Sequence, residues 1–200
     1  MPGYRSTEMR QLASRLQMDY SAKDEWGILN LLTDFRLFRR GYGKRISNVI
    51  SVKDSMMNSH MHIFDYKFTV GGGNSTRRIK QTVFFVDSKQ LGLPHFSMRP
   101  EHFFHKIGQR LGMQDIDFVE YPTFSNQYLV KGDDEGLIRS VMSEDVLQFF
   151  TLEKYWSMEG MNYFFIFYRW NKILKVDQVR ELHKKGLRVF EMLKDSSFFP

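Results

Sequence analysis

Residues His60 to Val86 read HMHIFDYKFTV, then GGGNSTRR, then IKQTVFFV, and the rest of the predicted fold is built around them. In the first part of this stretch apolar side chains alternate with polar ones at the period of a half-buried β-strand, and the last part repeats this alternation. The polar, glycine-rich connector predicts a β-hairpin with a long tip. Because an isolated hairpin is only marginally stable in water, we expect the other segments to cover its aromatic face.

Composition limits the classes of protein to consider. With 200 residues, 42% of them hydrophobic and 19 of them Phe, the chain suits one domain with a substantial core. It contains no Cys, which excludes disulfides, thiol catalysis and zinc sites built on thiolates. The formal net charge of +6 is compatible with nucleic acid, an anionic membrane surface or an acidic protein as partner.

Hydropathy bears on the location of the protein. No apolar run approaches the ~18 residues that a membrane-spanning helix needs, and the longest runs from Tyr163 to Tyr168. The N-terminal sequence MPGYRSTEMRQ has no hydrophobic segment of the kind found in signal peptides. We therefore expect a cytoplasmic location and no transmembrane segment.

Outside the hairpin, periodicity predicts further elements. In the first half, Met9, Leu12, Ala13 and Leu16 share one helical face, and a strand is expected near residues 45–53. Following the hairpin, the sequence predicts a loop at 91–97, a helix that begins at Pro100 and ends near Gly112, a strand at 128–131, and helices that begin near Asp134 and Ser143. The last elements expected are a second hairpin with its turn at Glu159–Gly160 and a strand at 163–168 that is buried on both faces. A long helix capped by Asp177 should follow, and its apolar seam is Val179, Leu182, Gly186, Phe190 and Leu193.

This order of elements predicts an α+β fold. We expect a mainly antiparallel sheet built from two β-hairpins plus single strands, with helices packed on one face and a long C-terminal helix. Residues 1–40 form an N-terminal helical segment, and residues 41–195 form an α+β domain that makes one structural unit with it. No repeat of fixed period and no linker divides the chain.

Much of residues 8–195 resembles a family of uncharacterised bacterial proteins. The stretches that carry the resemblance are QLASRLQMDYSAKDEW, Asn48-Val49, IFDYKFTVGGG, QTVFF, LPHFSMRPE, GMQDIDFVEYPTFSNQYLVKGDDE, LIRSVMSEDVL and WSMEGMNYFFIFYR. Relatives in this family are often predicted to be membrane-anchored through a hydrophobic segment upstream of the matching domain. The resemblance implies one intact domain and carries over no catalytic residue.

Basic residues form the most prominent candidate binding site. Five of them lie between residues 36 and 45, where Phe38 and Tyr42 are interleaved, and two more end the glycine-rich connector. Cations with interleaved aromatic rings can hold phosphates and stack on bases. The predicted basic patch is Arg36, Arg39, Arg40, Lys44, Arg45, Arg77 and Arg78.

Two patterns of metal-binding residue types carry weaker signals. His60 and His62 share one face of a strand, and Glu101 and His105 share one face of a helix, so the four together could ligate zinc. Acidic residues cluster at 115–120 and 133–135, but an Asp at 133 or 134 is also expected as a helix N-cap. No H-E-x-x-H motif and no Walker loop is present, and we predict no metal, no cofactor and no catalytic residue.

The sequence thus favours a non-enzymatic domain for protein interaction or assembly, with a protein partner or self-association. The alternative is a basic protein that binds nucleic acid or an anionic surface through the predicted patch. A metal-dependent hydrolase built on the carboxylates or histidines is the second alternative.

Overall fold

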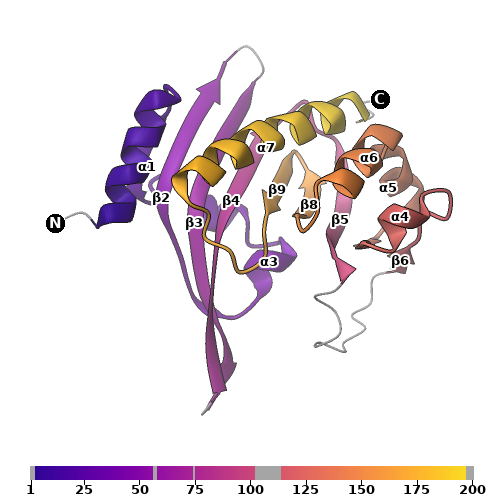
Figure 1. Ribbon diagram of the computed structural model, residues 1–200, viewed down its shortest axis with the longest axis horizontal. Helices are drawn as coiled ribbons and strands as arrows, with labels where there is room; N and C mark the ends of the chain where they lie inside the picture. The colour runs from indigo at the N-terminus through magenta and orange to yellow at the C-terminus, as the bar shows by residue number, and fades with distance from the viewer. Residues whose placement is uncertain (1–2, 56–57, 74, 102–113, 197–200) are drawn as a thin grey trace.

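One antiparallel sheet organises the protein (Figure 1). The computed structural model describes residues 3–55, 58–73, 75–101 and 114–196. In these residues the sheet has nine strands in the order β1-β2-β3-β4-β9-β8-β5-β7-β6. The strands are β1 (Asp19–Lys23), β2 (Tyr42–Asp54), β3 (Ser59–Gly72), β4 (Ser75–Ser88), β5 (Leu93–Pro100), β6 (Gln114–Ile116), β7 (Tyr128–Gly132), β8 (Ser157–Asn162) and β9 (Phe164–Tyr168).

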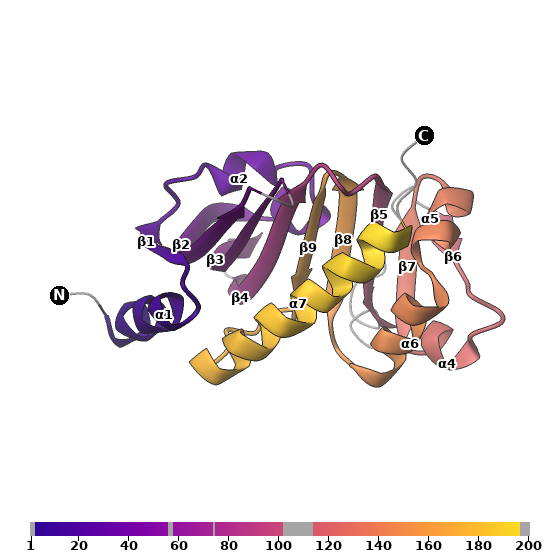
Figure 2. The same ribbon diagram turned by 90° about the horizontal axis from the view of Figure 1, so that it is seen from above.

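Helices cover the sheet, with the main layer on one face. This layer comprises α1 (Tyr4–Arg15), α4 (Pro122–Ser125), α5 (Glu135–Val141), α6 (Glu144–Leu152) and α7 (Val176–Ser196). The short helices α2 (Ile28–Leu31) and α3 (Arg36–Arg39) lie on the opposite face, and Figure 2 shows α2 across the sheet from α7. The predicted α+β class, antiparallel sheet, helical layer and long C-terminal helix are confirmed.

The predicted hairpin is present as β3 and β4, and it separates two cores. Phe64 is the register partner of Val83, and both side chains belong to the core beneath α2 and α3. Their neighbours Ile63 and Phe84 belong to the core beneath α1 and α7, because successive side chains of a strand point to opposite faces. Aromatic residues therefore fill both faces of this hairpin.

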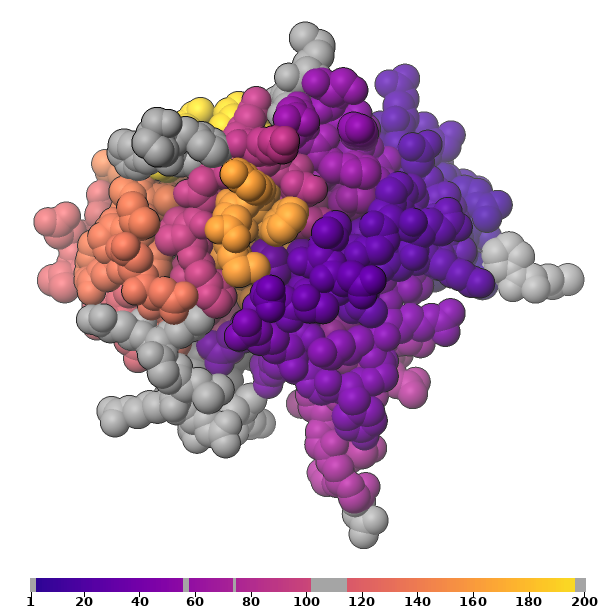
Figure 3. Space-filling model, turned by 180° about the vertical axis from the view of Figure 1, so that it is seen from behind, coloured from indigo at the N-terminus to yellow at the C-terminus, as the bar shows by residue number. Residues whose placement is uncertain are grey.

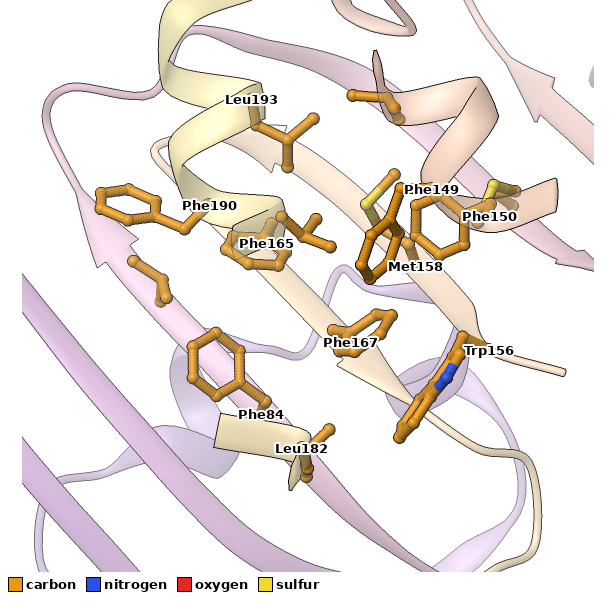
Figure 4. Close-up of a cluster of buried hydrophobic side chains, with 14 of the residues drawn as sticks. Phe84, Phe149, Phe150, Trp156, Met158, Phe165, Phe167, Leu182, Phe190 and Leu193 are labelled. Atoms are coloured by element: carbon orange, nitrogen blue, oxygen red, sulfur yellow. The ribbon is translucent and has the colours of Figure 1, made fainter. Parts of the chain in front are cut away.

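The larger core lies between the sheet and helices α6 and α7. Figure 4 shows Phe165 of the sheet next to Phe190 of α7, and Phe167 of the sheet next to Trp156. A Cβ atom at Gly186 would lie 2.6 Å from the Phe84 ring, so only glycine lets α7 lie this close to β4. The seam predicted for this helix, which includes Gly186 and Phe190, is confirmed as buried.

A buried polar network fastens α1 to the sheet. The Asp65 carboxylate accepts two hydrogen bonds of 3.0 Å from the Arg5 guanidinium. It also accepts one of 3.1 Å from Asn48 Nδ2 and one of 2.9 Å from Thr82 Oγ1. The amide oxygen of Asn48 in turn accepts a hydrogen bond from the Tyr20 hydroxyl at 3.1 Å. A charged carboxylate can be buried here because several donors satisfy it.

The loop predicted at 91–97 is wrong, because strand β5 begins at Leu93. Gly92 and Pro94 resemble turn signals, but Pro94 lies where the register of β5 against β8 shifts between Leu93 and Phe96. Proline is tolerated in strands at such irregularities, where no ladder hydrogen bond is required of it. β5 pairs with β7 as far as Pro100, so Pro100 ends a strand and does not begin the predicted helix. Residues 102–113, which make up the rest of that predicted helix, lie outside the described residues.

The turn predicted at Glu159–Gly160 is also wrong. Both residues lie inside β8, and the chain turns at Asn162, whose φ of +54° is tolerated by Asn. Gly160 serves close packing instead, since a Cβ atom there would lie 2.4 Å from the Phe96 ring. Glu159 is therefore a buried residue of a central strand.

Other predicted elements are confirmed. The helix near Met9 is α1, and the strand near 45–53 is β2. The strand at 128–131 is β7, and Asp134 caps α5 by accepting a hydrogen bond from the Leu137 N–H at 2.9 Å. The strand β9 occupies the middle of the sheet and is buried on both faces. The N-terminal segment contributes a strand, β1, that the sequence did not predict.

Candidate functional site

The fold divides the predicted basic patch into two groups. Arg36, Arg39 and Arg40 lie at α3, on the face of the sheet that α2 and α3 cover. Figure 3 views the molecule from this side. Lys44 and Arg45 lie at the start of β2, and Arg77 and Arg78 lie at the start of β4, near the tip of the long hairpin.

The α3 group is engaged with other side chains. Arg39 pairs with Asp34 at 3.5 Å, and the Arg40 guanidinium lies 4.7 Å from the centre of the Trp170 ring. Phe38, predicted as a stacking platform, is buried and stacks on Tyr66 with ring centres 4.3 Å apart. It is therefore not accessible to a base.

Three residues of the second group, but not Lys44, belong to a basic ribbon, which we define as Arg45, Lys67, Arg77, Arg78 and Lys80. The hairpin that carries most of these residues projects beyond the rest of the fold (Figures 1 and 3). Arg45 is the register partner of Lys67, and Lys67 is the register partner of Lys80, so three neighbouring strands place three cations in one row. Residues directly opposite one another share a face of the sheet.

The row of Arg45, Lys67 and Lys80 does not stabilise the fold. Like charges that face one another across strands destabilise a sheet. On the same face the next residue along β3 is Asp65, whose carboxylate is already occupied by Arg5. Within the described residues, no member of the basic ribbon forms an ion pair. The ribbon therefore presents uncompensated positive charge.

The part of β4 that carries Arg77, Arg78 and Lys80 has an open edge on the side away from β3. β9 pairs with β4 only between Val83 and Asp87. Beyond that, the outward N–H of Thr82 donates to the Lys172 carbonyl at 3.0 Å, and that of Lys80 donates to Asn171 Oδ1 at 3.2 Å. Because outward groups recur at every second residue, those of Thr76 and Arg78 come next. No described segment pairs with either of them.

The histidines of β3 are packed in the fold. His60 bonds to the Ser51 hydroxyl at 3.0 Å, and His62 stacks on Phe85 with ring centres 5.5 Å apart. Burial, with a smaller contribution from His60, lowers the pKa of His62 to about 3. Glu101, the helical partner expected in a zinc site, lies beyond β5, and His105 lies outside the described residues.

We expect His62 to make folding sensitive to acid. Its pKa is about 3 in the folded protein and about 6.5 when unfolded, so below pH 6.5 the unfolded chain takes up a proton that the folded protein does not. The loss should reach about 2 kcal/mol at pH 5 relative to pH 7. Urea unfolding of the wild type and of His62→Phe at both pH values measures this contribution.

The variant should lose about 2 kcal/mol less than the wild type on this change of pH. Equal losses in wild type and His62→Phe would show that His62 is protonated in the folded state.

The acidic clusters are also engaged with the surrounding fold. Asp115 pairs with Lys131 at 2.7 Å, and Asp133 lies 3.0 Å from the His95 ring. Glu135 pairs with Arg139 at 2.7 Å along α5. Across the described residues, no group of three or more His, Asp and Glu is placed to hold a metal ion. These contacts give the acidic residues structural roles.

The fold and the basic ribbon define an α+β domain with a broad antiparallel sheet and a projecting cationic hairpin. No family model matches the chain, and no curated protein matches it. Among solved structures, it is similar to the crystal structure of the mycobacterial trehalose monomycolate transport factor A, TtfA. The two share 12% identity and a TM-score of 0.61, over 96% of this chain and 93% of that chain. At this identity the likeness shows a common fold.

Among the described residues, no helix combines the length and apolar composition of a membrane span.

Proposed function

We propose that the protein is a non-catalytic interaction domain that binds an acidic segment of a partner protein along the outer edge of β4. The observation that carries this proposal is the open edge at Thr76 and Arg78, flanked by the cations of the basic ribbon. An extended peptide that adds to an open edge gains main-chain hydrogen bonds, and alternate side chains give specificity. Acidic side chains on one face of that peptide would meet Arg78 and Lys80, which lie on the same face of the sheet as Lys67.

The open edge favours a protein over the other anionic partners. Nucleic acid and membrane surfaces respond to positive charge, but neither completes a strand ladder. The same cations repel a second copy of this hairpin, which is how proteins keep edges from pairing with themselves. The protein of similar fold is named as a transport factor, which supports an accessory role here. A cytoplasmic location is part of the proposal.

Peptide binding tests the proposal directly. We would measure fluorescence anisotropy with a labelled ten-residue peptide of alternating Val and Glu, and with the Val and Lys version as a negative probe. Reversing Arg77 and Arg78 to Glu should weaken binding of the acidic peptide by about tenfold or more. Thr76→Pro should also weaken it several-fold, because it removes an outward N–H and leaves every charge in place.

A matched control is the reversal of Arg180 and Lys184, two exposed cations on α7, to Glu. It changes the net charge equally and should leave peptide binding unchanged. Single-stranded DNA and vesicles containing phosphatidylglycerol serve as the competing ligands. If either binds more tightly than the peptide and Thr76→Pro has no effect on any ligand, the ribbon is a general anion surface and the proposal is wrong.

A further inference from the structure

The outer edge of β1 is a second open strand edge, at the opposite end of the sheet from β6. β1 stands first in the strand order, and within the described residues it pairs with β2 alone. Figure 2 shows β1 at the end of the sheet, with α1 on one side of it and α2 on the other. Main-chain groups along such an edge are available to a further strand.

Charges of opposite sign stand at the two ends of β1. Asp19 begins the strand and Lys23 ends it, and both side chains are exposed. They lie four residues apart in a strand, so they share one face of the sheet. Within the described part of the chain, neither side chain belongs to an ion pair. Both charges are therefore available to a partner.

The sequence of β1 is complementary to itself when it is read in the opposite direction. An antiparallel pair of two copies, related by a two-fold axis at Ser21, places Asp19 of each copy opposite Lys23 of the other. The same register places Tyr20 opposite Ala22, a large side chain opposite a small one. A two-fold axis can pass through either kind of antiparallel residue pair, so this register does not depend on which main-chain groups of β1 point outward.

This symmetry removes the usual obstacle to self-pairing. Lysine on an edge strand normally keeps two copies apart, because equal charges meet. Around Ser21 each Lys23 faces Asp19 instead, and opposite charges directly across a strand pair stabilise the pair. The open part of β4 differs, since between Thr76 and Lys80 it carries three cations and no acidic residue.

The fold also holds β1 ready to pair. The Tyr20 hydroxyl donates to Asn48 Oδ1 at 3.1 Å, and the Arg10 guanidinium lies 5.3 Å from the centre of the Tyr20 ring. The Lys23 N–H donates to the Ser21 hydroxyl at 3.2 Å, and Ser21 is 5% exposed. Because the strand is already ordered by these contacts, pairing costs little further conformational entropy.

We propose that β1 pairs with β1 of a second copy of the protein, so that the two sheets join across a two-fold axis at Ser21. The partner at this edge is therefore the protein itself, whereas the edge of β4 takes an acidic segment of another protein. Five paired residues on each copy form a small interface, so the dimer should exchange reversibly with the monomer.

Sedimentation velocity over about a hundredfold range of protein concentration tests this pairing, and we expect the monomer to give way to a dimer as concentration rises. Asp19→Lys and Lys23→Asp should each weaken self-association by about tenfold or more, because like charges then meet at both ends of the strand pair. One substitution raises the net charge and the other lowers it, so a general effect of charge cannot explain both losses.

An equimolar mixture of the two variants should associate as the wild type does, since every lysine then faces an aspartate again. Recovery in the mixture also shows that both variants fold. Lys172→Asp, at an exposed lysine beside β4, is the matched control for Lys23→Asp and should leave self-association unchanged. The proposal is overturned if the wild type stays monomeric, if either reversal in β1 leaves self-association unchanged, or if the mixture fails to recover the dimer.

Discussion

Replacing Asp65 with Ala is expected to lower the free energy of unfolding by about 3–5 kcal/mol. The carboxylate is the shared acceptor for Arg5, Asn48 and Thr82, which come from α1, β2 and β4. Its removal leaves a partly buried guanidinium without its counter-charge and two buried donors without an acceptor. Urea unfolding at pH 7 measures the loss.

Two further variants separate this effect from ordinary surface charge. Asp34 also pairs with an arginine, but both side chains are more than half exposed, so Asp34→Ala should change stability by less than about 1 kcal/mol. Replacing Arg5 with Met in the Asp65→Ala background should recover part of the loss, because no unpaired charge is then left at the site. A loss below about 1 kcal/mol for Asp65→Ala would mean that α1 is held by apolar packing alone.

Phe167→Ala is expected to destabilise the fold by about 3–5 kcal/mol. This side chain is fully buried in the larger core, where it stacks on Trp156 with ring centres 4.5 Å apart and meets Phe150 edge-on at 5.9 Å (Figure 4). Truncation leaves a cavity between the sheet and α6 that close packing cannot fill. The measurement is again urea unfolding at pH 7.

The matched control is Tyr163→Ala, at the turn between β8 and β9. Tyr163 is 45% exposed, so its truncation should change stability by less than about 1 kcal/mol. Both variants should bind the acidic peptide as the wild type does wherever they are folded, because the basic ribbon lies away from this core. Weakened peptide binding by folded Phe167→Ala would link the core to the ribbon and contradict the separation of roles.

The hairpin and the long helix were predictable because their signals are local. Alternation around Phe64 fixes a strand within a few residues, and the seam through Gly186 and Phe190 fixes a helix. Gly160 shows where such reasoning fails: glycine is a turn signal in sequence, yet here it makes room for the ring of Phe96. The misplaced turn concealed Glu159, since a residue in a turn is expected to be exposed.

The sequence revealed part of the basic ribbon, but it did not reveal the buried environment of Glu159. Arg77 and Arg78 were predicted because they are adjacent in the chain, whereas Lys67 and Lys80 joined them only through the register of β3 and β4. Buried Glu159 of β8 accepts hydrogen bonds from the Tyr168 hydroxyl of β9 and from the Leu37 N–H of α3, and its register partner on β5 is Ser97. Their separation in sequence is large and carries no periodic signal, so no local pattern could have indicated it.

The α+β class, the hairpin, the helical seams and the excess of positive charge could all be read from the amino-acid sequence. These follow from hydrophobic periodicity and composition, which are properties of neighbouring residues. The assembled fold, and no local pattern, sets which cations face one another, which strand edge stays open and which carboxylates are buried. Those features depend on strand order and register, and they arise when segments far apart in the chain pack together.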